Sequence, residues 1–207
     1  ASSIAKRAGL TTGAIYSRYE NSDEMLIALW QQVVAHELRA LVAETVEAVT
    51  TRSTTGVPSD LVARLEKPSR ILGLGAEFVV MAQRNEVVGE VVIAEVSKWL
   101  HEAGLQSGAT AIDRAGVALG ASIAIGSTLR SFVTTTNPAM GLVLDGIHNA
   151  YLSANAKHSR AKVQVPEPIR SNTGSALRDA LIDATAEVMS KTGFTGATIS
   201  RVARKSG

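Results

Sequence analysis

Residues 4–19 read Ile-Ala-Lys-Arg-Ala-Gly-Leu-Thr-Thr-Gly-Ala-Ile-Tyr-Ser-Arg-Tyr. The first half of this stretch predicts a short helix, because Ile4 and Ala8 lie one turn apart and would both face inward. Ala5 is small enough to lie where two helices cross. Gly9 follows, and glycine readily adopts the left-handed backbone that ends a helix. We therefore expect a helix that stops sharply at this glycine.

The second half of the stretch predicts another helix directly after a tight turn. We expect Leu10 to fill the corner, and Thr11 or Thr12 to cap the new helix. Ile15 and Tyr19, four residues apart, would pack this helix down. The side chains left outward are those of Gly13, Ala14, Ser17 and Arg18, with Tyr16 at the edge. This arrangement is a helix-turn-helix, whose second helix enters the major groove of DNA.

The rest of the 207-residue chain also predicts helices, because proline is rare and apolar residues recur at spacings of three and four. A long helix is expected over 21–49, with an apolar stripe of Leu26, Trp30, Val33, Val34, Leu38, Leu41 and Val42. Further helices are expected over 60–65, 71–83, 85–104, 109–133, from Asn137 and Pro138 onward, and over 176–191 with a break at Gly193. Residues 87–93 are rich in β-branched side chains and could form a strand, but the neighbouring pattern favours helix. The predicted fold class is all-α.

Small residues form a seam on the helix expected over 109–133. Gly116, Gly120 and Ala124 recur every four residues, and the missing side-chain volume lets a second helix approach closely. This seam suits a crowded core within one chain and an interface between two subunits equally well. The pattern alone leaves both alternatives open.

Composition excludes several classes of protein. Hydrophobic residues make up 45% of the chain, charged residues 19%, and cysteine is absent. This balance is typical of a packed globular protein rather than a disordered one. The lack of cysteine excludes a disulfide scaffold, a zinc-finger cluster and a cysteine nucleophile. With no apolar run of ~20 residues and no charged-then-apolar leader, we expect no membrane partner and a cytoplasmic location.

Charge is distributed unevenly along the chain. Residues 157–207 carry nine Lys and Arg against four Asp and Glu, whereas residues 1–156 carry twelve against fifteen. A basic end on an acidic body is expected where one end meets a polyanion, although a solvated basic linker has the same composition.

The quoted stretch, followed by Asn-Ser-Asp-Glu-Met-Leu, resembles the DNA-binding segment of the tetracycline-repressor (TetR) family of bacterial regulators. The likeness is motif-specific over residues 1–30, and over 31–156 it rests on the number and order of helices. One position departs from the family pattern, because Ser22 stands where the family usually carries a lysine that touches phosphate. The resemblance implies a helix-turn-helix followed by a helical ligand-binding and dimerisation bundle.

The resemblance also implies a function. Such a protein is a ligand-responsive transcriptional regulator, most often a repressor, that binds double-stranded operator DNA and is released by a small apolar or amphipathic effector. The residues assigned to DNA are Lys6, Arg7, Thr11, Thr12, Gly13, Tyr16, Ser17, Arg18, Thr198, Arg201, Arg204 and Lys205. Those assigned to an effector pocket are Trp30, Phe78, Met81 and Trp99. Those assigned to a homodimer or intrachain pseudo-dimer are Gly116, Gly120, Ala124, Leu144, Ile147 and Tyr151.

The C-terminal segment carries part of the motif a second time. Ile-Ala-Lys-Arg-Ala-Gly at 4–9 matches Val-Ala-Arg-Lys-Ser-Gly at 202–207, with a constant offset of 198. A circular permutation would contain each helix of the motif once, whereas here the second helix occurs twice, so a tandem repeat fits better. The expected domains are a partial helix-turn-helix without its first helix at 1–20, an effector-binding and dimerisation domain at 21–160, a linker at 161–174, and the first two helices of a second helix-turn-helix at 175–207.

Two other functions compete with DNA binding. The first is an effector sensor or dimerisation module whose helix-turn-helix motifs are degenerate and no longer bind DNA. Ser22 and the doubled motif favour it. An enzyme is the second. Three short motifs occur in the order found in penicillin-binding serine enzymes, at Ser3 to Lys6, Ser153 to Asn155 and Lys191 to Gly193. Their spacing does not fit that class of enzyme. The four histidines are scattered, so we expect no catalytic site, no metal and no cofactor.

Overall fold

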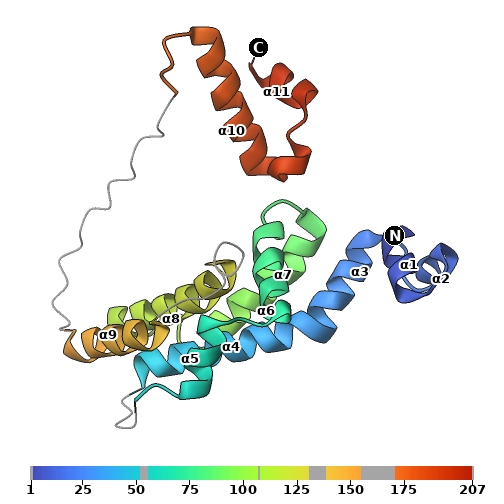
Figure 1. Ribbon diagram of the computed structural model, residues 1–207. Helices are drawn as coiled ribbons and strands as arrows, with labels where there is room; N and C mark the ends of the chain where they lie inside the picture. Colours follow the sequence, from blue (N-terminus) through green and yellow to red (C-terminus); the bar gives the residue numbers. More distant parts are fainter. Residues whose placement is uncertain (1, 52–55, 107, 131–138, 155–170, 207) are drawn as a thin grey trace. The chain divides into compact units, whose positions relative to one another are not determined.

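The computed structural model describes residues 2–51, 56–106, 108–130, 139–154 and 171–206, and every regular element among them is a helix. The chain divides into two compact units, Ala1–Ala156 and Lys157–Gly207. Figure 1 shows the helices α1 to α9 of the first unit and α10 and α11 of the second. The all-α prediction is confirmed. Among the described helices, none combines the length and the apolar content that crossing a bilayer requires.

The first unit begins with two short helices that contact each other, α1 (Ser2–Ala8) and α2 (Thr12–Tyr16). A long helical rod follows, made of α3 (Ser22–Leu29), the π-helical turn η1 (Trp30–Val34) and α4 (Ala35–Thr50). The three segments join without a break, as the blue-to-cyan ribbon of Figure 1 shows. The helix predicted over 21–49 is therefore confirmed, with a π turn that the sequence did not predict.

The π turn changes which side chains of the rod are buried. Inside it, the Ala35 N–H donates to the Trp30 carbonyl oxygen, five residues earlier instead of four. Trp30 and Val34 are 0% exposed, whereas Val33 is 42% exposed. The prediction that Val33 belongs to the buried stripe is wrong, because the wider π turn shifts the phase of the helix. Downstream of it, the predicted stripe residues Leu38, Leu41 and Val42 are buried as expected.

Five more helices complete the first unit: α5 (Ser59–Glu66), α6 (Arg70–Met81), α7 (Glu86–Glu102), α8 (Ala111–Arg130) and α9 (Met140–Ser153). Their positions confirm the helices predicted over 60–65, 71–83 and 85–104. The helix expected over 109–133 is confirmed as far as residue 130. The start predicted at Asn137 and Pro138 lies outside the described residues.

The β-branched stretch over 87–93 is helical because the start of α7 is fixed locally. The Asn85 side-chain oxygen accepts a hydrogen bond from the Val88 N–H at 3.0 Å and so caps the helix. The Asn85 amide also donates to the Asp23 carboxylate at 2.8 Å, which ties α7 to α3. Val88 and Val92, four residues apart, are buried, so the apolar spacing and the cap agree.

Helix α4 forms the centre of the first unit and packs against α5, α6, α7, α8 and α9. Its closest neighbour is α8, at the seam of small residues. A Cβ added at Gly120 would lie 2.7 Å from the Val46 Cα, and one added at Gly116 would lie 2.7 Å from the Thr50 Cγ2. Ala124 is 0% exposed. The seam therefore faces α4 of the same chain, which corrects its assignment to a dimer interface.

The second unit contains α10 (Ala176–Gly196) and α11 (Ile199–Ser206), which pack against each other. Gly193 interrupts α10 with φ 72° and ψ 176°, so the predicted break at this glycine is confirmed. Residues 161–170 of the predicted linker lie outside the described residues. Its last part turns into α10, and the Thr173 N–H donates to the Asp179 carboxylate at 2.8 Å.

Candidate DNA-binding segment and surface pocket

The turn between α1 and α2 is fixed by hydrogen bonds. The Leu10 N–H donates to the Ala5 carbonyl at 2.9 Å, and the Gly9 N–H donates to the Lys6 carbonyl at 3.4 Å. Gly9 has φ +65°, so these bonds form the Schellman ending of a helix with glycine in the left-handed position. The Thr11 Oγ1 then accepts from the Ala14 N–H at 3.1 Å and caps α2. Of the two threonines considered, Thr11 is therefore the cap.

Three of the apolar side chains expected inside this segment are exposed. Ala5 is 2% exposed and Ile15 is 9% exposed, so each of the two contacting helices buries one apolar side chain. Ile4 is 46% exposed and Leu10 is 53% exposed. Ala8 is also exposed. The predictions that Ile4 and Ala8 face inward and that Leu10 fills the corner are wrong for the described structure, because no described element covers these side chains.

The residues assigned to DNA in the first unit all lie at the surface. One side of α2 is formed by two adjacent pairs, Thr12 with Gly13 and Tyr16 with Ser17. The pairs lie four residues apart, about one helical turn. Tyr16 is 58% exposed, which is unusual for a large aromatic side chain that could instead be packed. Lys6 and Arg7 on α1, Thr11 at the cap and Arg18 after α2 are also exposed. The segment thus presents a polar, aromatic and basic surface.

Ser22 occupies the first turn of α3 rather than a basic residue. Asn21 caps this helix through its Oδ1, which accepts from the Glu24 N–H at 2.9 Å. The Glu24 carboxylate in turn accepts from the Glu20 N–H at 2.6 Å. Asp23 and Glu24 already place negative charge at the positive end of the helix dipole. A phosphate at this helix start would therefore meet two carboxylates and no ammonium group.

The residues assigned to DNA in the second unit are exposed, but several of them bind other parts of the unit. Thr198 caps α11, with its Oγ1 accepting from the Arg201 N–H at 3.4 Å. The Arg201 guanidinium donates to the Gly196 carbonyl at 3.0 Å, and the Arg204 Nε donates to the Ser200 carbonyl at 3.3 Å.

Lys205 forms an ion pair that the sequence did not predict. Its Nζ lies 2.9 Å from the Glu187 carboxylate of α10, and Lys191 lies 2.9 Å from the same oxygen. Hydrogen bonds from Lys191 and Lys205 lower the pKa of the Glu187 carboxyl below its ordinary value. Only spatial proximity between α10 and α11 reveals this triad, because Lys205 and Glu187 are eighteen residues apart.

The aromatic residues assigned to an effector pocket pack against one another. The Trp30 ring centroid lies 5.4 Å from that of Phe78 and 5.7 Å from that of Trp99. Trp30 is 0% exposed and Phe78 is 3% exposed, and Met81 packs on the same core. The Trp30 Nε1 donates to the Glu95 carboxylate at 2.8 Å. The four side chains serve as core in the described structure.

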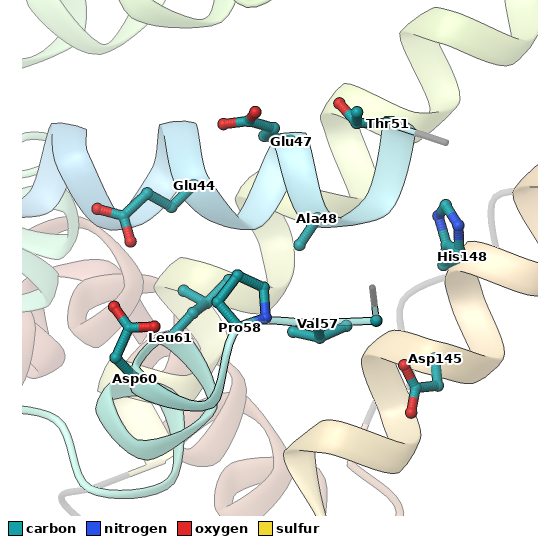
Figure 2. A pocket seen from close by; sticks show the side chains of 11 residues that line it. Glu44, Glu47, Ala48, Thr51, Val57, Pro58, Asp60, Leu61, Asp145 and His148 are labelled. Carbon is teal, nitrogen blue, oxygen red and sulfur yellow. The ribbon is translucent and has the colours of Figure 1, made fainter. Parts of the chain in front are cut away.

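The structure instead places a surface pocket beside the far end of α4, with a volume of about 250 Å³. Figure 2 shows that its side chains come from the end of α4, from the segment leading into α5 and the first turn of α5, and from α9. Its apolar lining is Ala48, Val57, Pro58 and Leu61, and its acidic lining is Glu44, Glu47, Asp60 and Asp145. No pattern in the sequence predicts this pocket, because its residues lie in three separate segments.

Charge in this pocket is only partly neutralised. Glu44 forms an ion pair with Arg64 of α5. Within the described part of the chain, Glu47, Asp60 and Asp145 have no basic side chain within ion-pair distance. The His148 Nδ1 lies 3.0 Å from the Val49 carbonyl oxygen, which holds the ring at the pocket wall. The pocket therefore combines an apolar surface with a net negative charge.

A second hollow, of about 300 Å³, lies between α4 and α7 and has basic side chains. His36, Arg39 and Lys98 line it together with Glu95 and Trp99. The Arg39 guanidinium lies 2.8 Å from the Glu102 carboxylate, so its charge is shared within the protein. Among the described residues, no three His, Asp or Glu side chains are grouped so that they could hold a metal ion.

The remaining residues assigned to a dimer interface are buried or half-buried within the unit. Leu144 is 0% exposed, which corrects its assignment to a subunit contact. Ile147 packs on the core, and the Tyr151 hydroxyl donates to the Asp113 carboxylate at 2.9 Å. The opposite sides of the two helices are exposed and carry Arg114, Asp145 and Asn149 among mostly small and apolar residues: Ala115, Ala118, Leu119, Ser122, Gly126 and Leu129 on α8, and Leu142, Val143, Gly146 and Ala150 on α9.

No family model, curated protein or solved structure that was compared with this chain matches it.

Proposed function

We propose that this chain is a ligand-responsive transcriptional regulator, a repressor that binds operator DNA through α1 and α2. The observation that carries the proposal is the exposed side of α2, with Tyr16 58% exposed, held by the Gly9 turn and the Thr11 cap. An exposed aromatic ring beside Thr12 and Arg18 suits contact with a partner molecule. A DNA major groove admits one helix and offers partners for each of these side chains.

In this proposal α2 lies in the groove and α1 crosses the backbone. Lys6 and Arg7, exposed at the end of α1, contact phosphates, which supply affinity without sequence choice. Thr12, Tyr16, Ser17 and Arg18 provide the base and phosphate contacts of the second helix. Because Ser22 brings no positive charge, binding by one segment is weak, and two segments acting together provide the affinity.

The exposed face of α8 and α9 supports the pairing that this requires. Its small residues repeat at helical spacing, and Leu142 is 75% exposed. A partner with the same face, either a second chain or a second unit of one chain, would bury these apolar side chains. We therefore place the homodimer or pseudo-dimer contact on this face, opposite the glycine seam.

The pocket of Figure 2 is the effector site in this proposal. Its apolar lining suits a hydrophobic body, and Glu47, Asp60 and Asp145, which have no basic partner among the described residues, suit a positive charge, so the effector is a small amphipathic cation. The pocket touches the end of α4, and the same rod reaches α3 at its other end. A ligand that shifts α4 can therefore move α1 and α2, which couples the two sites.

Fluorescence anisotropy on a randomised duplex pool across a salt series, followed by sequencing of retained DNA, tests DNA binding. We expect steep salt dependence and an enriched two-part site. Arg18→Ala should lower the affinity by about 1–3 kcal/mol if the side chain reads a base, or reduce the salt slope by about 1 if it contacts phosphate. Arg70→Ala is the matched control, because Arg70 is an exposed arginine at the start of α6, outside α1, α2 and the exposed face of α8 and α9.

If no DNA is retained even at low salt, DNA binding is refuted. The result would then favour an effector sensor whose helix-turn-helix no longer binds DNA. In that case the pocket still predicts ligand binding. Thermal stability of the protein with amphipathic amines measures this separately, because a ligand that binds only the folded state raises the unfolding temperature.

A further inference from the structure

The second hollow, between α4 and α7, lies between two polar contacts that join the rod to α7. At one end the Trp30 Nε1 donates to the Glu95 Oε2 at 2.8 Å. At the other end the Arg39 guanidinium lies 2.8 Å from the Glu102 carboxylate. Trp30 and Arg39 are nine residues apart, which corresponds to roughly 14 Å of helix. The space between the two contacts, about 300 Å³, suits a small molecule.

The two ends of the second hollow carry opposite charge. At one end two cations, Arg39 and Lys98, share the single carboxylate of Glu102. The Lys98 Nζ lies 3.9 Å from this carboxylate, which is too far for a hydrogen bond, so its ammonium has no hydrogen-bond partner among the described residues. At the other end, Glu95 has no basic side chain within ion-pair distance in the described part of the chain.

An apolar base joins the two charged ends. Trp99 and Ala35 line the hollow and are 8% and 7% exposed. The Trp99 ring is stacked on that of Trp30, with the ring centroids 5.7 Å apart, so its position is fixed. His36 lines the hollow from the exposed side. The hollow therefore offers an apolar surface between a carboxylate and an ammonium group.

We infer that the second hollow binds an amino acid with an apolar side chain. The carboxylate of the ligand pairs with Lys98 and Arg39, its ammonium pairs with Glu95, and its side chain lies on Trp99. A ligand with one charge only would leave one end of the hollow unpaired.

This site is distinct from the pocket of Figure 2, with which it shares no lining residue. It is also independent of DNA binding, because none of its residues belongs to α1 or α2.

Tryptophan fluorescence of the full chain, titrated with three related compounds, tests the inference. Phenylalanine carries both charges, hydrocinnamate only the carboxylate and phenethylamine only the ammonium. Both tryptophans of the chain, Trp30 and Trp99, contact or line the hollow, so the signal reports this site. We expect a saturable change with phenylalanine and an affinity about tenfold or more lower for each analogue, since each analogue lacks one charged contact.

Two substitutions separate the two ends of the hollow. Glu95→Gln removes the charge but keeps an oxygen that can accept from Trp30, so it should weaken phenylalanine about tenfold and spare hydrocinnamate. Lys98→Gln should weaken phenylalanine and hydrocinnamate and spare phenethylamine. The Lys98 side chain is 73% exposed, so this variant tests the site even if Glu95→Gln does not fold.

Two controls should bind phenylalanine as the wild type does. Glu90→Gln removes an exposed carboxylate of α7 outside the hollow, and Asp145→Asn alters only the pocket of Figure 2. The inference is overturned if phenylalanine gives no saturable change, if hydrocinnamate binds as tightly as phenylalanine, or if Lys98→Gln binds phenylalanine unchanged. Weaker binding by Asp145→Asn would also overturn it, because the ligand would then occupy the other pocket.

Discussion

The contact between α4 and α8 leads to the sharpest prediction, which compares two glycines of one helix. A Cβ at Gly120 would lie 2.7 Å from the Val46 Cα and 3.0 Å from the Val46 nitrogen, both backbone atoms that cannot rotate away. At Gly126 nothing lies within 4 Å of the same added atom. Gly120→Ala and Gly126→Ala therefore add the same methyl group in opposite surroundings.

Both substitutions gain helix propensity, about 1 kcal/mol for glycine to alanine in a helix interior. Gly120→Ala also forces α8 away from α4, and overpacking of this kind costs typically ~1–3 kcal/mol. The propensity gain cancels in the comparison, so Gly120→Ala should be less stable than Gly126→Ala by about 1–3 kcal/mol. Gly126→Ala should itself be slightly more stable than the wild type.

Urea unfolding followed by tryptophan fluorescence measures this difference. Both tryptophans of the chain, Trp30 and Trp99, lie in the first unit, so the signal reports that unit alone. The change that Gly120→Ala causes relative to the wild type should not depend on protein concentration, because its contact with Val46 lies within one chain. Equal stability of the two variants, or an effect of Gly120→Ala that grows on dilution, would refute the intrachain assignment of the seam.

Three further predictions concern single side chains. Thr11→Ala should destabilise α2 by about 1 kcal/mol and Thr11→Ser should not, as measured by amide exchange over 12–16. Asn85→Ser keeps a cap for α7 but loses the bond to Asp23, so exchange at the start of α3 should quicken while α7 stays protected. Because its ion pairs hold the folded pKa of Glu187 below the unfolded value, their stabilisation is present above the unfolded pKa and is lost as the pH falls through the folded pKa. Glu187→Gln should therefore remove this part of the acid-induced loss of helicity, with circular dichroism against pH as the assay.

The helix boundaries could be predicted because their signals are local. Asn21, Asn85 and Thr198 cap their helices through side chains three residues from the amide they bind, and Gly193 breaks α10 within its own backbone. Each of these signals lies within one turn of sequence. The same holds for the turn at Gly9, which depends on no distant residue.

Burial could be predicted only where the neighbour was known. The spacing of Gly116, Gly120 and Ala124 is the same whether the helix that packs against them is α4 or belongs to a second chain. The sequence alone therefore does not distinguish a core contact from a subunit interface. The π turn carries no sequence signal, so the apolar spacing alone predicts a buried Val33, which is 42% exposed. The acidic pocket was missed because Glu47, Asp60 and Asp145 look like ordinary solvated charges until three segments meet.

The π turn between α3 and α4 also sets the direction in which α2 points. A π turn is equivalent to one residue inserted into an α-helix, and one residue corresponds to a rotation of roughly 100° about the helix axis. Removing Gln31 or Gln32, both exposed, would restore a regular α-helix and turn the amino-terminal helices around the rod by that angle. The presence or absence of one residue in this turn thus determines the rotation of α1 and α2 about the axis of α4. The surface of α2 itself does not change.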